Sequence, residues 1–410
     1  MIAVRAEPSD GEASGEMIGA VRAEPSDGEA SGEMIGAVRA EPSDDEASGE
    51  MIGAVRAKPS DGEASGEMAA NERAGVKAAV FRGNGRIAAE DWPRPTIGAG
   101  ELLLRLRGCG LCGSDIAKIV APDTKAPAVF GHELVGDVIE AGAGVQGIAR
   151  GDRVVAAHHV PCGECHYCRR GSESMCRAFK ESHLDPGGFA EFVRVPATNV
   201  AHATFRLPER VSDEAASFVE PLGCCVRATR RTGARAGDTA VVVGLGSIGC
   251  LFVQLLARTG ATVVGMDASP GRVEIARGLG LPAMSMSEAN TAIARLSGGR
   301  GADVVLITGG AASVLGWAVT AVRDGGSIHY FAGGPGDALP VALETLYHRE
   351  LTITATYSSS PADLSEAFRL VTTGAVTLEP LYTHRLPLDR LDEGVDLMRT
   401  GRALKVYVTP

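Results

Sequence analysis

The stretch Thr239-Ala-Val-Val-Val243-Gly244-Leu-Gly246-Ser247-Ile248-Gly249 decides the fold of the second half of the chain. Its first five residues form a continuous apolar run, which is typical of a strand buried on both faces of a parallel sheet. The glycines mark a tight turn, Cys250–Arg258 has a helical pattern, and Ala261–Met266 is the next expected strand. The order strand, turn, helix, strand is the first unit of a doubly wound parallel sheet.

The same alternation continues towards the C-terminus. Helical segments separate three further expected strands, at Ala302–Thr308, Gly326–Phe331 and Leu351–Ala355. The fold class is therefore α/β. The last part of the chain returns to short strand-like runs, through Ala403–Thr409, and is expected to rejoin the first half.

The pattern changes on the N-terminal side of Ser212, where Ser212-Asp-Glu is typical of the start of a helix. Before it, short apolar or alternating runs are separated by Gly and Pro, which predicts a small β-barrel-like domain. The expected strands of that domain are Val76–Phe81, Glu101–Arg107, Glu133–Ala141, Val154–His158 and Phe189–Val195.

Residues 1–67 are a tandem repeat. The unit Met17–Glu33 recurs from Met34 and from Met51, and a copy one residue shorter starts at Met1. Each unit has few sizeable apolar groups among Pro, Gly, Ser and acidic residues, so it cannot bury enough surface to offset its chain entropy. We therefore expect a disordered tail. Its near-identical copies indicate recent duplication, which would place the true start at Met68, and an interaction tail is the alternative.

The net charge of −11 resides in these repeats. Residues 1–67 carry 16 acidic and 5 basic side chains, which leaves 35 of each in the remainder. The globular part is thus neutral, which argues against nucleic acid or an anionic membrane as a partner. No apolar run approaches the roughly 20 residues that a membrane span requires.

Four of the nine cysteines, Cys162, Cys165, Cys168 and Cys176, are spaced as metal ligands. Two-residue gaps let successive thiolates turn onto one ion, and tetrahedral Zn²⁺ takes four such ligands. Disulfides are the alternative. An odd, clustered set of cysteines with no preceding secretory signal favours a reducing compartment instead, and we expect a cytoplasmic protein. Because protein would occupy all four positions, this zinc is expected to be structural.

The glycine turn after Val243 has the context of a dinucleotide-binding site. Gly244 permits the tight turn, Gly246 lets the backbone approach a pyrophosphate, and Gly249 lets helix and strand pack closely. Ser247 and Ile248 begin the helix, whose free N–H groups and positive dipole end attract phosphates.

Asp267 ends the second expected strand, 18 residues beyond the last glycine of the turn. A carboxylate there accepts hydrogen bonds from the ribose hydroxyls and repels a 2′-phosphate, so we predict NAD rather than NADP. Arg272 is the complication, because a nearby arginine can accept that phosphate, but the acid at the strand end should dominate.

A second candidate metal site combines Cys112, His132, Glu133 and Glu220. Taken alone, each cysteine or histidine would more often be a structural residue. Together, beside a nicotinamide-binding domain, they suit a zinc ion with one open position. Such an ion binds an alcohol oxygen and lowers its pKa, which favours the loss of hydride from the alcohol carbon.

These motifs resemble the zinc-dependent medium-chain alcohol dehydrogenase family, and within it the sorbitol (polyol) and threonine dehydrogenase branch. The resemblance covers roughly residues 74–410. It rests on Gly110-Leu-Cys112-Gly-Ser114-Asp115, Gly131-His132-Glu133, Gly151-Asp152-Arg153-Val154, the four-cysteine run, Pro186-Gly-Gly-Phe-Ala-Glu191, Glu220-Pro221-Leu222 and the glycine fingerprint.

The resemblance implies a particular division of the chain. After the tail of residues 1–67, residues 68–222 would form a GroES-like β-barrel catalytic domain with the structural zinc lobe. Residues 223–357 would form a Rossmann domain that binds NAD, and residues 358–410 would return to the catalytic domain. A homo-oligomer, dimer or tetramer, is the family's habit.

The resemblance also implies roles for the site residues. Cys112 and His132 correspond to ligands of the catalytic zinc. Glu133 resembles the family's acid that ligates the metal directly or exchanges with it, and Glu220 stands where polyol dehydrogenases place a glutamate. Which glutamate completes the resting shell stays open. Ser114 matches the hydroxyl that takes the substrate proton.

The chain departs from the family pattern at one point of the proton route. The family usually has a histidine three residues beyond this serine, whereas here the position is Ala117, followed by Lys118. The route would then end on water, on the cofactor ribose or on another side chain.

Other nearby side chains are given no part in the chemistry. Asp115 is expected to have a hydrogen-bonding role. Cys224 and Cys225 lie out of register for metal ligation. The remaining histidines of this region have no clear spacing to a metal and are expected to be structural or pocket residues: His158, His159 and His183.

The sequence thus predicts a zinc-dependent enzyme that oxidises a secondary alcohol with NAD⁺. The substrate would be a small molecule, a polyol, cyclitol or amino alcohol, and the product a ketone. A threonine-type amino-alcohol dehydrogenase is the alternative within this class, and a zinc-free quinone reductase is disfavoured by the ligand set. A catalytically silent scaffold that binds NAD and zinc is the alternative from another class.

Overall fold

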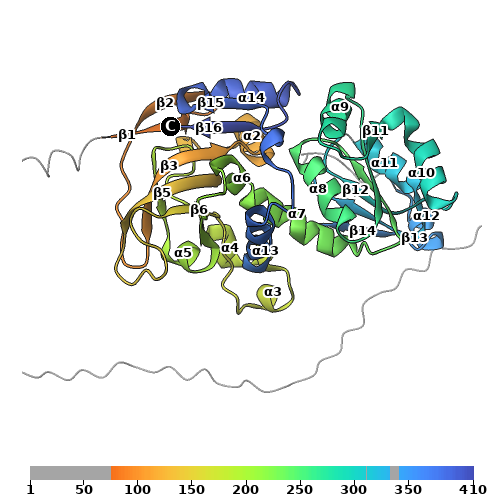
Figure 1. The fold of residues 1–410 in the computed structure, drawn as a ribbon, viewed down its shortest axis with the longest axis horizontal. Helices are drawn as coiled ribbons and strands as arrows, with labels where there is room; N and C mark the ends of the chain where they lie inside the picture. Colours follow the sequence, from red (N-terminus) through yellow and green to blue (C-terminus); the bar gives the residue numbers. More distant parts are fainter. Residues whose placement is uncertain (1–74, 311, 333–340) are drawn as a thin grey trace, which may run out of the picture. The chain divides into compact units, whose positions relative to one another are not determined.

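The computed structural model describes residues 75–310, 312–332 and 341–410, which belong to one compact unit. Figure 1 shows its two sheet systems and the helices around them. The disorder predicted for residues 1–67 lies outside the described residues. None of the helices in the described ranges is both long and apolar enough to cross a membrane.

The first sheet system is mainly antiparallel, as predicted for a barrel-like domain. A seven-stranded sheet has the order β15-β16-β3-β5-β6-β8, with β7 paired to the first part of β3. A three-stranded sheet has the order β2-β1-β4. The strands are β1 Val76–Phe81, β2 Ile87–Trp92, β3 Leu102–Gly110, β4 Ala128–Val129, β5 Glu133–Ala141, β6 Arg153–Ala156, β7 Phe192–Val195, β8 Thr204–Arg206, β15 His384–Pro387 and β16 Val406–Thr409.

Short helices connect these strands. Ser212 caps one of them, since its side chain accepts a hydrogen bond from the amide of Ala215 at 3.1 Å, as the polar run at Ser212 predicted. The helical elements of this part are α2 Gly113–Val120, α3 His166–Arg169, η1 Glu173–Met175, α4 Arg177–Glu181, α5 Ala197–Ala203 and α6 Asp213–Ser217.

The second sheet is parallel, with the strand order β11-β10-β9-β12-β13-β14. All five residues of β9 are buried, as expected for a strand covered on both faces. The chain leaves β9 in one direction towards β11 and later returns to its other side with β12, so the predicted doubly wound sheet is confirmed. The strands are β9 Thr239–Val243, β10 Thr262–Asp267, β11 Ala283–Ser285, β12 Ala302–Ile307, β13 Val322–Tyr330 and β14 Thr352–Ala355.

Helices alternate with these strands, as a parallel sheet requires. α8 begins directly after the glycine turn and packs on β9 and β10. The helical elements of this part are α7 Val219–Thr232, α8 Ser247–Ala257, α9 Pro270–Gly278, η2 Met286–Glu288, α10 Ala289–Ser297, α11 Ala312–Ala321 and α12 Leu343–His348.

The C-terminal segment contributes to the first sheet system. β16 pairs with the end of β3, where Tyr407 lies opposite Gly110 and Val408 opposite Cys109. Before it, α13 packs against α7 and is started by a capping box between Ser360 and Asp363. The remaining elements are α13 Pro361–Thr372, η3 Glu379–Leu381, η4 Leu388–Arg390 and α14 Leu391–Arg399. The domain boundaries at residues 222 and 357 stay predictions.

Candidate metal and cofactor site

The four predicted structural-zinc ligands lie together in the lobe formed by α3, η1 and α4. Their sulfur atoms all lie within 4.8 Å of one another, with separations of 3.5 Å from Cys165 to Cys168 and 3.6 Å from Cys176 to Cys162. Tetrahedral Zn–S bonds of about 2.3 Å place sulfurs about 3.8 Å apart. The four thiols are free, so the lobe fits a zinc ion and contains no disulfide.

Strand pairing brings the two halves of the second candidate site together. Gly110, at the end of β3, lies opposite Glu133, at the start of β5. Cys112 and His132 are therefore at the same end of two adjacent antiparallel strands. Ligand atoms of Cys112, His132 and Glu133 lie within 4.8 Å of one another, although 20 residues of sequence separate the cysteine from the histidine.

Cys112 is the N-cap of α2. Its sulfur accepts hydrogen bonds from the Ser114 amide at 3.5 Å and from the Ser114 hydroxyl at 3.3 Å. Ser114 itself is exposed, which leaves its hydroxyl open to a bound substrate. The family's proposed proton acceptor thus lies directly beside the proposed zinc thiolate.

Asp115 orients the histidine of this site. Its buried carboxylate lies 3.2 Å from Nδ1 of His132 and accepts hydrogen bonds from the amides of Cys112 and Gly131. Although burial alone would lower it, the Asp115 carboxylate holds the pKa of His132 well above its ordinary value. With Nδ1 held by the carboxylate, Nε2 is left for a metal, which is the usual role of such a partner.

Glu133 is held by a lysine that sequence reasoning missed. The Lys405 ammonium lies 2.8 Å from Oε1 and 2.6 Å from Oε2 of Glu133, and both side chains are buried. It also donates to the Leu111 carbonyl at 3.3 Å. The only signal in the sequence is a lysine inside the apolar strand run of Ala403–Thr409.

Glu220 lies in the first turn of α7, and burial raises its pKa to about 7. Its neighbour is His158, whose Nδ1 is 3.8 Å from Oε1 of Glu220. Ligand atoms of His132, His158 and Glu220 lie within 4.8 Å of one another. His158, which has no clear metal spacing in the sequence, is thus brought into the site by the fold, and burial lowers its pKa well below the ordinary range.

The other side chains near the site are arranged largely as the sequence suggested. Among the described residues, neither Cys224 nor Cys225 belongs to a metal-capable group, although the Cys224 sulfur is 3.7 Å from Oε1 of Glu220. His183 is not part of such a group either, and its Nδ1 contacts the Glu181 carbonyl at 2.8 Å.

The glycine turn lies between β9 and α8. Gly244 has a φ of +96°, a backbone conformation that residues with a side chain rarely adopt. A Cβ on Gly249 would collide with the Gly244 carbonyl. No atom lies within 4 Å of where a Cβ on Gly246 would be, so the backbone is open to an approaching phosphate. Ser247 is the first residue of α8, followed by Ile248.

Asp267 ends β10 beside this turn. Its two oxygens accept hydrogen bonds from the amides of Leu245 at 2.7 Å and Ser269 at 2.8 Å. Arg272 lies 3.6 Å from its Oδ2. The carboxylate is thereby fixed at the edge of the turn, and each oxygen retains a lone pair for a further donor.

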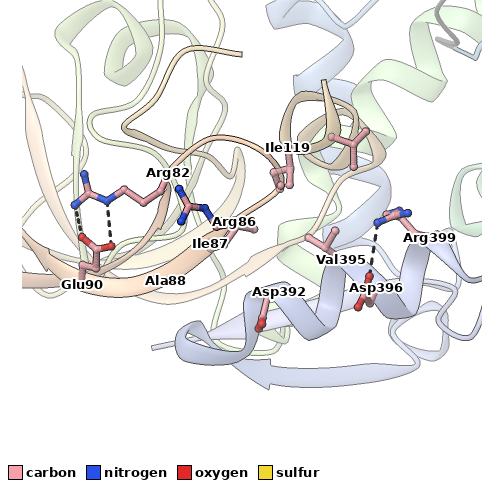
Figure 2. Close-up of a pocket in the computed structure, with 12 residues that line it drawn as sticks. Arg82, Arg86, Ile87, Ala88, Glu90, Ile119, Asp392, Val395, Asp396 and Arg399 are labelled. Atoms are coloured by element: carbon pink, nitrogen blue, oxygen red, sulfur yellow. Dashed lines mark hydrogen bonds and ion pairs between the residues drawn. The ribbon is translucent and has the colours of Figure 1, made fainter. Parts of the chain in front are cut away.

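A separate hollow of about 570 Å³ lies between β2, α2 and α14. Figure 2 shows residues that line it, among them Ile119 and Val395, and the ion pairs of Arg82 with Glu90 and Arg399 with Asp396. None of the candidate site residues lines it. It is therefore apart from the metal and cofactor residues.

Comparisons with known proteins agree with this arrangement. Residues 98–208 match the alcohol dehydrogenase GroES-like domain, and residues 247–373 match the zinc-binding dehydrogenase family. The chain is 30% identical to a sorbitol dehydrogenase of Halalkalibacterium halodurans over 336 residues, which are 80% of this chain and 97% of that protein. It is 30% identical to an L-threonine 3-dehydrogenase of Serratia proteamaculans over 329 residues, 78% of this chain and 95% of that one.

The fold has close counterparts among solved structures. A Sinorhizobium meliloti 1021 protein described as a zinc-binding dehydrogenase, whose crystal structure holds NADP, superimposes with a TM-score of 0.73 at 29% identity. The match covers 82% of this chain and all of that one. The chain belongs to the zinc-containing medium-chain alcohol dehydrogenase family and is a zinc-dependent alcohol dehydrogenase.

Proposed function

We propose that this dehydrogenase oxidises a small secondary alcohol, a polyol, cyclitol or amino alcohol, to a ketone, with NAD⁺ as the acceptor. The observation that carries the proposal is the convergence of Cys112, His132 and Glu133 within 4.8 Å of one another. Relatives named for sorbitol and for L-threonine support a hydroxyl on a secondary carbon as the reacting group.

The donor set of this site fits zinc, since one thiolate, one imidazole and a carboxylate are ligands that zinc accepts. Cys112 and His132 would hold the ion, with Glu220 or Glu133 as the acidic donor. A zinc ion bound there supplies Lewis-acid polarisation of the alcohol oxygen, and NAD⁺ supplies the hydride acceptor. The cysteines Cys162, Cys165, Cys168 and Cys176 would hold the structural ion.

The protein's own groups manage the proton and the orientation. Ser114 is placed to accept the hydroxyl proton of the alcohol, because its Oγ lies 3.3 Å from the Cys112 sulfur and the residue is exposed. Asp115 keeps the His132 ring turned towards the metal site through its contact with Nδ1. Since Ala117 cannot carry a proton onwards, we infer that the proton leaves Ser114 through water or the cofactor ribose.

The cofactor preference follows from Asp267. Its carboxylate is buried and held by two backbone amides, so it cannot turn away from a 2′-phosphate. Arg272 is already within 3.6 Å of that carboxylate and is partly neutralised by it. We therefore propose NAD as the cofactor, in contrast to the NADP that the Sinorhizobium meliloti protein holds.

A panel of alcohols, including sorbitol, cyclitols and L-threonine, followed as NADH absorbance, tests this function. We expect turnover with at least one secondary alcohol, and a higher kcat/KM for NAD⁺ than for NADP⁺. Cys112→Ala or His132→Ala should abolish turnover while NAD⁺ binding persists. Full activity in either variant, or a preference for NADP⁺, would contradict the corresponding part of the proposal.

A further inference from the structure

We propose that His158 is a fourth protein donor to the catalytic metal, which in the substrate-free enzyme is held by Cys112, His132, Glu220 and His158. When substrate binds, the alcohol oxygen takes the place of His158, which restores the open position that a catalytic zinc needs. Glu133, in this arrangement, stays in its ion pair. The inference rests on the proposed function, because it presupposes a zinc ion at the site of Cys112 and His132.

The position of His158 suits a metal ligand. Its Nδ1 lies 3.8 Å from Oε1 of Glu220, which is too far for a hydrogen bond. The same nitrogen is inaccessible to solvent and has no hydrogen-bond partner among the described residues. Buried polar atoms are almost always partnered, so an atom without a partner calls for an explanation.

A shared metal ion supplies that explanation. Zinc bonds of about 2.0–2.2 Å to nitrogen and oxygen in a tetrahedral arrangement place the two donor atoms about 3.4 Å apart. The observed 3.8 Å is close to this value, and a ligand nitrogen of His132 lies within 4.8 Å of both groups. An ion among the three would satisfy the otherwise unpartnered nitrogen of His158.

The alternative acidic donor, Glu133, is already engaged. Both of its oxygens lie within 2.8 Å of the Lys405 ammonium, although only Oε1 accepts a hydrogen bond from it, and neither side chain is exposed by more than 2%. Moving Glu133 onto the metal would leave a buried ammonium without its counter-charge, which is strongly unfavourable. His158 has no such competing contact.

The ring of His158 is held in place by contacts with two neighbouring rings. Its centroid lies 4.5 Å from that of His132 and 3.7 Å from that of His159. The ring of His159 packs in turn against that of Phe179, with 4.7 Å between the centroids, and its Nδ1 lies 2.6 Å from the Ser182 carbonyl. The row of rings therefore keeps the donor nitrogen beside Glu220 before a metal binds.

Metal affinity tests the assignment without relying on activity. We would titrate the zinc-loaded full-length enzyme with a competing chelator and compare wild type with His158→Ala, His158→Gln and the control His183→Ala. His183 is a histidine of the same region whose contact is to the Glu181 carbonyl. We expect both His158 variants to lose the catalytic zinc, the more weakly held of the two ions, at a chelator concentration at least roughly tenfold lower than wild type requires. The His183 variant should match wild type.

A crystal structure of the zinc-loaded, substrate-free enzyme decides the geometry directly. We expect a His158 nitrogen about 2.0–2.1 Å from the catalytic zinc. A zinc held by Cys112, His132 and an acid with His158 more than about 3 Å away would overturn the inference. Unchanged zinc affinity in both His158 variants would do the same.

A wrong proposed function and a wrong assignment of His158 give different experimental results. If the proposed function is wrong, wild type holds one zinc instead of two, or oxidises no alcohol of the panel. If only the inference is wrong, wild type holds two zincs and oxidises an alcohol, while the His158 variants bind both ions as tightly. Retention of the four-cysteine zinc in the variants shows that they are folded.

Discussion

Lys405 and Glu133 form a buried ion pair beside the proposed zinc ligands Cys112 and His132. The ammonium contacts both carboxylate oxygens and the Leu111 carbonyl, so each charge is compensated inside the protein. Although burial alone would lower it, Glu133 raises the pKa of Lys405. Such a pair adds little net stability compared with apolar residues, but the loss of one partner is severe because the other charge stays buried.

We therefore predict that Lys405→Met destabilises the protein by about 3–5 kcal/mol, since Glu133 would be left without its counter-charge. The urea midpoint of unfolding, followed by circular dichroism, measures the effect. The double variant Lys405→Met/Glu133→Gln should recover most of the lost stability, because it removes both charges. Equal stability of Lys405→Met and wild type would show that the pair is not isolated from water.

His329 of β13 gives the protein a pH-dependent stability. Its ring is fully buried, contacts the Thr354 hydroxyl at 2.8 Å, and burial lowers its pKa from 6.5 to about 4. The folded protein therefore takes up this proton later than the unfolded chain as the pH falls. Stability from this group is complete above pH 6.5 and declines towards pH 4, at most by about 3 kcal/mol.

This behaviour predicts a difference between wild type and His329→Gln. From pH 7 to pH 5 wild type should lose about 2 kcal/mol more stability than the variant, which has no ionisable group at that position. Unfolding midpoints in urea at the two pH values measure the difference. Parallel losses in both proteins would mean that other groups cause the acid sensitivity.

Residues with a local pattern could be predicted from the sequence, and those defined by distant contacts could not. Cys112, His132 and Glu220 stand in short motifs that the fold brings together; the pairing of β3 with β5 explains why Cys112 and His132 converge, and Glu220 comes from α7. Lys405 and His158 have no such motif. Lys405 is 272 residues from Glu133 in the sequence. His158 is placed beside the site by the rings of His132 and His159, which the sequence does not reveal.

At the scale of elements, apolar runs decided which strands the sequence could predict. β1, β5 and β9 have the expected limits; β9 is buried throughout, β1 in all but one residue, and β5 begins with four buried residues. β2, Ile87–Trp92, is absent from the prediction because none of its residues is buried; its strand conformation comes from pairing with β1 along its whole length. Pairing of this kind is a tertiary contact, which overrides local propensity.

The packing of the four-cysteine lobe is too small to stabilise its fold. α3, η1 and α4 have three to five residues each, far below the length at which a helix is stable alone. Their buried side chains are few, so we propose that the metal supplies the missing stabilisation. Phe179 of α4 connects this lobe through His159 to His158.

We predict that Cys168→Ser releases one zinc per chain and also weakens the second zinc site, because the row of rings loses its support. Zinc content and chelator competition measure both effects, and limited proteolysis reports the opening of residues 162–181. Cys250→Ser, which changes a buried cysteine of α8, is the matched control and should retain both ions. A Cys168→Ser protein with an unaltered second site would show that the lobe and the catalytic metal are independent.

At the scale of the whole molecule, one apolar core joins the two sheet systems. It contains Val135 and Val155 of the antiparallel sheet and Val242 and Leu306 of the parallel sheet in a single cluster. α7 and α13, packed against each other, contribute further members of the same cluster, among them Leu222. Because buried apolar contacts run without a break from one sheet to the other, neither sheet can unfold without exposing the surface of its neighbour.

The last prediction follows from this shared core and uses the two tryptophans as separate reporters. Trp92 lies in β2 of the first sheet system and Trp317 in α11 of the second, both half-buried, and residues 1–67 contain no aromatic residue. Trp92→Phe leaves only the second reporter, and Trp317→Phe only the first.

In full-length protein loaded with zinc, we expect both variants to show the same urea midpoint by fluorescence, coincident with that from circular dichroism. The reason is that unfolding is cooperative. Once α7 and α13 separate, both sheets lose buried apolar contacts at the same time. Two separated midpoints would instead mean that the parallel sheet and the antiparallel sheet system unfold as independent domains. In that case the shared cluster would be a weak contact surface, and loss of one zinc should leave the unfolding of the parallel sheet unchanged.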